Sequence, residues 1–172
     1  MKYADGPTVE VEILIDAPPA TVWRLASDPT TPARFSDELL EVHWIDDHRF
    51  VGRNRHPAIG EWETTCTVVA HEPETTFAWA VGEPDHPSAE WRFTLTGHGE
   101  GTRLHQWLRI GPAPSGLTSA IEAMPDKEER IIDRRLAEHR ANMTATLQGI
   151  KQLAEDARGH GPTTPGSDAG AS

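Results

Sequence analysis

Residues 76–110 read TFAWAVGEPDHPSAEWRFTLTGHGEGTRLHQWLRI, and this stretch decides the fold. Large apolar side chains recur at every second position in three short segments, which is the period of a β-strand with one buried face. Turn-forming residues separate the segments, from Gly82 to Pro87 and from Gly97 to Gly101. Because such short gaps suit hairpins, we expect consecutive strands to pair antiparallel.

The same alternation continues toward the N-terminus. Seven strands are expected, at 9–15, Leu39–Ile45, Arg49–Arg55, Glu61–Ala70, Thr76–Val81, Ala89–Leu95 and Arg103–Ile110. Two short helices, Ala20–Ser27 and Thr31–Phe35, are expected between the first strand and the second. On the last six strands, the predicted inward face consists of Leu40, Val42, Trp44, Phe50, Gly52, Asn54, Trp62, Thr64, Cys66, Val68, Phe77, Trp79, Val81, Trp91, Phe93, Leu95, Leu104, Gln106, Leu108 and Ile110.

The period changes after the last strand. Residues 126–157 form a predicted long helix, and Leu117–Met124 form a shorter helical turn before it. One face of the long helix consists of Ile132, Leu136, His139, Met143, Leu147, Ile150 and Ala154. A single apolar stripe has to be buried, and a curved sheet offers the surface. We therefore predict an α+β protein in which a curved antiparallel sheet wraps around the C-terminal helix and leaves a cavity between them.

Length and composition limit the number of domains and the classes of partner. With 172 residues the chain suits one domain, expected at 1–158, followed by a disordered Gly/Pro/Ser/Thr tail at 159–172. A net charge of −11 argues against nucleic acid and against anionic membranes as partners. Neither a signal peptide nor a stretch able to span a membrane is recognisable, so we expect a cytoplasmic protein without membrane insertion. The preference for Arg over Lys suggests a bacterial source.

The order of elements resembles the helix-grip fold of the START-like superfamily (SRPBCC). Within it, the chain is similar to the bacterial polyketide cyclase/dehydrase and lipid-transport-like branch, from about Thr8 to Asp156. The segments that carry the resemblance are VEVEILIDAPPATVW at 9–23, FVGRN at 50–54, the Trp62 strand that leads into Glu72-Pro73, FAW at 77–79, WRF at 91–93 and GTRL at 101–104. The resemblance implies a START/Bet v 1-like pocket that holds a sterol, lipid, quinone, plant hormone or polyketide intermediate.

A few polar residues interrupt the predicted inward face. They are Asn54, Thr64 and Gln106 on the strands and His139 on the helix. Each can orient a ligand or can simply be a satisfied core group. His139 is the candidate catalytic residue, because an imidazole at this position could titrate near neutrality and move a proton. The predicted ligand-binding residues are Trp44, Asn54, Trp62, Thr64, Trp79, Trp91, Gln106, His139 and Met143.

Other chemistries find little support. The histidines form no His-x-x-x-His pair or Cys/His cluster, so no metal site is predicted. No nucleophile motif and no glycine-rich phosphate loop is present, and no cofactor is expected. Charges of both signs alternate along the long helix, for example at Arg134, Arg135 and Glu138, and predict a solvated face with weak ion pairs.

Three functional hypotheses follow. The first is a protein that binds a small hydrophobic molecule, aromatic, polyketide-like or lipid, in the cavity. The second is a polyketide cyclase, aromatase or dehydratase that uses the same cavity, although the sequence shows no inward carboxylate opposite His139. The third is a homo- or hetero-interaction module, in which outward Trp107, Ile45 and Val51 would seed a homodimer.

Overall fold

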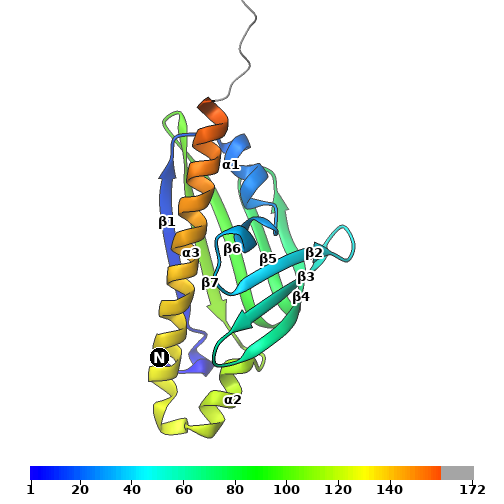
Figure 1. The fold of residues 1–172 in the computed structure, drawn as a ribbon, viewed down its shortest axis with the longest axis vertical. Helices are drawn as coiled ribbons and strands as arrows, with labels where there is room; N and C mark the ends of the chain where they lie inside the picture. Colours follow the sequence, from blue (N-terminus) through cyan, green and yellow to red (C-terminus); the bar gives the residue numbers. More distant parts are fainter. Residues whose placement is uncertain (160–172) are drawn as a thin grey trace, which may run out of the picture.

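A curved sheet and one long helix make up most of the molecule (Figure 1). The computed structural model describes residues 1–159. Seven strands form one antiparallel sheet in the order β1-β7-β6-β5-β4-β3-β2. The strands are β1 Thr8–Ile15, β2 Leu39–Trp44, β3 Arg49–His56, β4 Gly60–Glu72, β5 Thr76–Glu83, β6 His86–His98 and β7 Gly101–Ile110. The predicted helix-grip fold is confirmed, with β4 and β6 longer than expected.

The helices lie on the concave side of the sheet and at its ends (Figure 1). They are α1 Pro19–Ala26, α2 Gly116–Ala123 and α3 Glu128–Gly159, with 3₁₀ turns η1 Tyr3–Asp5, η2 Thr31–Arg34 and η3 Pro125–Lys127. The segment predicted as a helix at 31–35 is thus a 3₁₀ turn. Gly159, the first residue of the expected tail, ends α3; the remaining tail, 160–172, lies outside the described residues.

Irregular strand pairing accompanies the curl of the sheet. The pairing shifts in register between Leu39 and Glu41, between Val68 and Ala70, and between Val81 and Gly82. Such bulges bend a strand and increase its twist. The first two lie in the β2–β5 part of the sheet, which curls forward around one side of α3, and the third lies between β5 and β6 (Figure 1).

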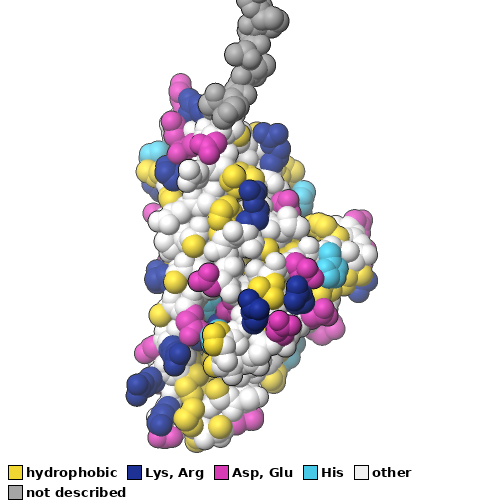
Figure 2. Space-filling view, viewed as in Figure 1, with side chains coloured by type: hydrophobic (Ala, Val, Ile, Leu, Met, Phe, Trp, Pro, Cys, Tyr) yellow, Lys and Arg dark blue, Asp and Glu magenta, His cyan; other side chains and the backbone are white. Residues whose placement is uncertain are grey.

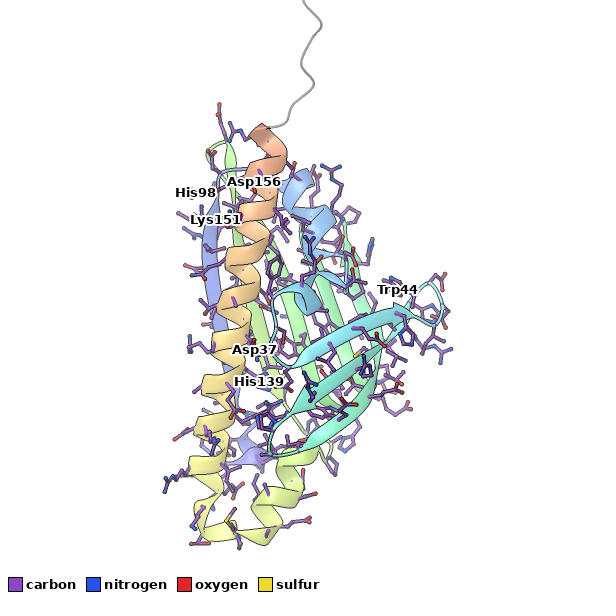
Figure 3. The ribbon with its side chains drawn as sticks, viewed as in Figure 1. Asp37, Trp44, His98, His139, Lys151 and Asp156 are labelled. Carbon is purple, nitrogen blue, oxygen red and sulfur yellow. The ribbon has the colours of Figure 1, made fainter. Side chains whose placement is uncertain are left out.

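The first bulge also changes which β2 side chains face inward. Leu39 and Val42 both line the cavity described below, although a regular strand would point them to opposite faces. Trp44 pairs with the inward residue Phe50, and their rings meet edge to face at 5.5 Å. Trp44 nevertheless remains 44% exposed, because it lies at the β2–β3 hairpin beyond the cover of the helices (Figure 3).

The free edge of β1 is covered by side chains of α3. Arg140, Lys151 and Arg158 donate hydrogen bonds to the main-chain oxygens of Glu10, Leu14 and Asp16, at 3.0, 2.9 and 3.3 Å. An unpaired strand edge is a template for association with another chain, and charged cover of this kind blocks it. These contacts also fix α3 along one side of the sheet.

Candidate functional site

Two adjoining chambers lie between α3 and the sheet. The inner chamber has a volume of about 120 Å³ and the outer chamber one of about 380 Å³. Both are lined by Glu38, Asn54, Thr64, Val81, Trp91 and His139, so the two chambers adjoin, and together they are called the cavity. Phe50, Cys66, Trp79, Gln106, Met143 and Thr146 belong to the inner chamber only, whereas Ile59, Trp62, Leu108, Ser115, Leu117 and Arg135 belong to the outer one. Enclosed apolar space with a few polar groups is typical of small-molecule sites.

A glycine on the inward face of β3 helps to keep the inner chamber open. Gly52 pairs with Val42 on one side and Thr64 on the other. A Cβ atom at this position would lie 3.2 Å from Leu39 Cδ1 and 3.3 Å from Thr64 Oγ1. Any larger side chain would therefore have to enter the chamber, which makes Gly52 a natural position for filling it.

Two tryptophans give the cavity a flat aromatic wall. Trp79 on β5 and Trp91 on β6 are cross-strand partners, and their rings stack at 5.9 Å with an interplanar angle of only 7°. His139 meets the Trp91 ring edge to face at 5.5 Å, and Phe50 meets Trp79 at 6.0 Å. Flat indole faces pack well against ring systems.

The polar groups of the inner chamber are weakly satisfied. Gln106 is only 2% exposed, and its Oε1 has no hydrogen-bond partner. The Asn54 amide nitrogen lies 3.4 Å from Gly52 O and 3.5 Å from Thr64 Oγ1, distances beyond those of strong hydrogen bonds. A ligand that offers these groups better hydrogen-bond partners would therefore break few existing hydrogen bonds.

Eight of the nine predicted ligand-binding residues line the cavity. Asn54, Thr64, Trp79, Trp91, Gln106, His139 and Met143 reach the inner chamber, and Trp62 reaches the outer one. Trp44 lines neither chamber. Trp44 lies at an alternate strand position that faces the inner side of the sheet. The alternation predicts only this side, however, and not how far along the sheet the helix covers it.

The prediction that His139 titrates near neutrality is wrong. Burial, together with the positive charge of Arg135 and the neighbouring His56, lowers the pKa of His139 from 6.5 to about 3. The side chain points from α3 toward the sheet (Figure 3). At neutral pH the ring is therefore an uncharged hydrogen-bonding group.

A cluster of charges beside His139 was not predicted. Arg135 on α3 donates to both carboxylate oxygens of Glu38, at 2.8 and 2.5 Å, and to Glu138 at 3.1 Å. Glu138 also lies 3.2 Å from His56 Nε2. The Arg135 and Glu38 side chains are 11% and 13% exposed. The expectations of a solvated ion-pair face at Arg135 and of no inward carboxylate near His139 are therefore corrected.

The pKa shifts of this cluster reflect the pairing. Burial opposes the charge of Arg135, but hydrogen bonds to Glu38 and Glu138 outweigh it and raise its pKa. Burial likewise opposes the charge of Glu138, yet the bonds from Arg135 hold its pKa below the usual value. One signal was available in the sequence, because Arg135 precedes His139 by four residues and so shares its helix face. The direction of Glu38 depends on the turn before β2, which no periodicity describes.

Two further features could suggest reactivity, the thiol of Cys66 and a cluster of possible metal ligands in the β2–β3 hairpin. Burial raises the pKa of the Cys66 thiol to about 12, so it stays protonated. Among residues 1–159, the one cluster that could gather around a metal ion is Asp46, Asp47 and His48 in the β2–β3 hairpin. The Asp46 carboxylate already accepts hydrogen bonds from Arg49 and from the His48 main chain, which explains the cluster as turn structure.

The amino-acid sequence matches the model of a known family. The family model described as "Polyketide cyclase / dehydrase and lipid transport" matches residues 6–155. The chain belongs to this family. The resemblance inferred from the sequence is thereby confirmed. Among curated proteins, no sequence matches significantly.

Solved structures support the same fold. The solution structure of a polyketide cyclase-like protein from Corynebacterium glutamicum is 27% identical, with a TM-score of 0.63, over 91% of this chain and 97% of that one. A Thermus thermophilus protein is 22% identical, with a TM-score of 0.59, over 88% and 99% of the two chains. An aromatase/cyclase from Streptomyces sp. R1128 is 18% identical, with a TM-score of 0.63, over 88% and 95%. The last two likenesses concern the fold.

A search of the described helices for membrane spans gives a negative result. No helix within residues 1–159 combines the length and the apolar character that crossing a bilayer requires.

Proposed function

We propose that this protein binds a small, flat, hydrophobic molecule in the two-chambered cavity, as a carrier or sensor in the cytoplasm. The observation that carries the proposal is the wall formed by Trp79 and Trp91, which stack almost parallel beside weakly satisfied polar groups. A planar ring system can pack against these indole rings. A flexible acyl chain would use the flat wall less well and would lose more conformational entropy on binding.

The charges around the cavity favour binding over catalysis. His139 is neutral at neutral pH, and the Cys66 thiol is protonated. Glu38 and Arg135 line the outer chamber, but their charges are paired with each other. Proton transfer is most effective when the pKa of the catalytic group lies near the working pH, and neither His139 nor the Cys66 thiol meets that condition.

Filling the inner chamber tests the proposal. We would titrate the protein with 2-naphthol by calorimetry and compare Gly52→Val with Gly97→Val. Valine at position 52 enters the chamber, whereas a Cβ at position 97 meets no atom within 4 Å on the exposed surface of β6. We expect Gly52→Val to weaken binding by tenfold or more and Gly97→Val to leave it unchanged. Absence of saturable binding to the wild type, or equal binding by both variants, would overturn the proposal.

A second candidate function is cyclase-type chemistry. One observation favours it: His139, Arg135 and Glu38 line the same outer chamber, where a guanidinium could polarise a substrate carbonyl. The test is product analysis by mass spectrometry after incubation with a linear poly-β-ketone thioester. Cyclised product from the wild type, lost in Arg135→Met but not in Arg134→Met, would make the enzyme hypothesis the better one.

The homodimer hypothesis has the least structural support. Trp107 lies on β7 beneath the Arg92 guanidinium, 5.0 Å from the ring centroid, while Val51 lies on β3. Three strands separate β7 from β3 in the sheet, so these residues form no single patch. Figure 2 shows acidic and basic side chains interspersed over the face that carries α3.

A further inference from the structure

Gln106 is the polar residue with the least support from its surroundings. In the sheet it pairs with Val11 on β1 and with Phe93 on β6, neither of which has a hydrogen-bonding side chain. Across the inner chamber, α3 presents His139, Asn142, Met143 and Thr146, and none of them hydrogen-bonds to the Gln106 amide oxygen. The Gln106 side chain is 2% exposed, and its amide oxygen has no partner. The fold itself therefore leaves this amide unsatisfied.

An unsatisfied amide at this depth calls for a ligand. Most buried polar side-chain atoms in proteins have a hydrogen-bond partner, and one that lacks a partner costs stability. Gln106 lines the inner chamber, so a molecule bound there can reach the amide. Rotation about the last side-chain bond exchanges the oxygen and the nitrogen, and a suitable partner should therefore both donate and accept. A hydroxyl group does both.

The strand register brings the amide close to the aromatic wall. Trp91 pairs with Leu108, so Gln106 is its diagonal neighbour on the same face of the sheet. Diagonal neighbours are separated by roughly 7–8 Å. A fused ring system that packs against Trp91 can therefore place an edge substituent at the Gln106 amide.

We propose that the ligand is a hydroxylated planar aromatic molecule and that Gln106 selects it by binding its hydroxyl group. This inference rests on the proposed function and adds the chemical class of the ligand. The preference for a hydroxylated ligand would arise because any ligand in the chamber excludes water from Gln106. A flat hydrocarbon that fills the chamber keeps water away from Gln106 and leaves the amide unpaired, whereas a hydroxylated molecule pairs with it.

The experiment compares two probes on three proteins. Calorimetry would measure the affinities of 2-naphthol and naphthalene for the wild type, Gln106→Met and Gln148→Met. Methionine is close to glutamine in length but offers no amide, and Gln148 lies exposed on the outer face of α3. The wild type should bind 2-naphthol about tenfold more tightly than naphthalene, the effect of one net hydrogen bond. Gln106→Met should lose this preference, and Gln148→Met should keep it.

The outcomes separate the two proposals. Binding of both probes with equal affinity by the wild type, or an unchanged preference in Gln106→Met, would overturn the role of Gln106 and leave the proposed function intact. Failure of both probes to bind the wild type would overturn the proposed function and this inference with it. The melting temperature of Gln106→Met should equal or exceed that of the wild type, since an unpaired buried amide is removed. If Gln106→Met did not fold, Gln106→Leu would replace it in the same comparison.

Discussion

The two halves of α3 meet the sheet in different ways. From Leu147 to Ala154 the helix packs directly on a dry core that includes Trp23 of α1 and Phe77 of β5. From Arg135 to Met143 it spans the two chambers, where much of its inner face meets open space. Apolar packing holds the first half, and the ion pairs of Arg135 help to hold the second. One amphipathic stripe thus serves as a structural core and as the wall of a binding site.

The largest difference between the halves should appear on truncation of apolar side chains. Ile150 is fully buried in the packed half, and Ile150→Ala should lower the free energy of unfolding by about 3–4 kcal/mol through lost burial and a new cavity. Leu136 is partly buried in the chamber half, and Leu136→Ala should cost only about 1 kcal/mol. Urea denaturation measures both. Equal losses would mean that the chamber half is packed as tightly as the other.

The chamber half should depend on its charges instead. Arg135→Met removes the charged partner of the largely buried Glu38 and one of the partners of Glu138. We expect a loss of about 2–3 kcal/mol. Arg134→Met is the matched control, because the Arg134 side chain is 79% exposed and its bond to Glu138 should contribute at most about 0.5 kcal/mol. Similar losses in the two variants would argue against a special role for the Arg135 cluster.

Tight packing of the other half should make a helix glycine indispensable. A Cβ at Gly149 would lie 2.4–2.5 Å from three ring atoms of Phe35. Gly149→Ala should therefore destabilise the protein by about 1–2 kcal/mol, even though alanine favours helices. In Gly116→Ala the new Cβ would meet Ile59 at an ordinary 3.8 Å, so no loss is expected there. Thermal melting of the pair tests this, and a stabilised Gly149→Ala would contradict the close packing.

The remaining prediction concerns pH. His139 has a pKa of about 3 in the folded protein and a usual value of 6.5. Between these values the unfolded chain binds more protons, so stability should fall as pH is lowered from 6.5 toward 3, by at most about 1.4 kcal/mol per pH unit. His139→Gln lacks this contribution. The difference between the two stability curves isolates it, and a flat difference would mean that His139 titrates normally in the folded state.

Strand parity predicted most of the site for a simple reason. Side chains on alternate positions face one side of a sheet, so Asn54, Thr64, Trp79, Trp91 and Gln106 were placed together from the sequence. Parity failed at β2, where a bulge brings Leu39 inward and the hairpin carries Trp44 beyond the cavity. The electrostatics could not be predicted, because the pKa of His139 depends on burial, on Arg135 of the same helix and on His56 of β3.

The sequence by itself determined the order of strands and helices, the face that each presents, and the family. These properties depend on periodicity and turn residues, which are local. The tertiary structure alone decided that Glu38 and Arg135 bond beside His139, that Gly149 admits Phe35 against α3, and that Gln106 remains without a partner. Each of these depends on distances between segments far apart in the chain, and no local pattern encodes such distances.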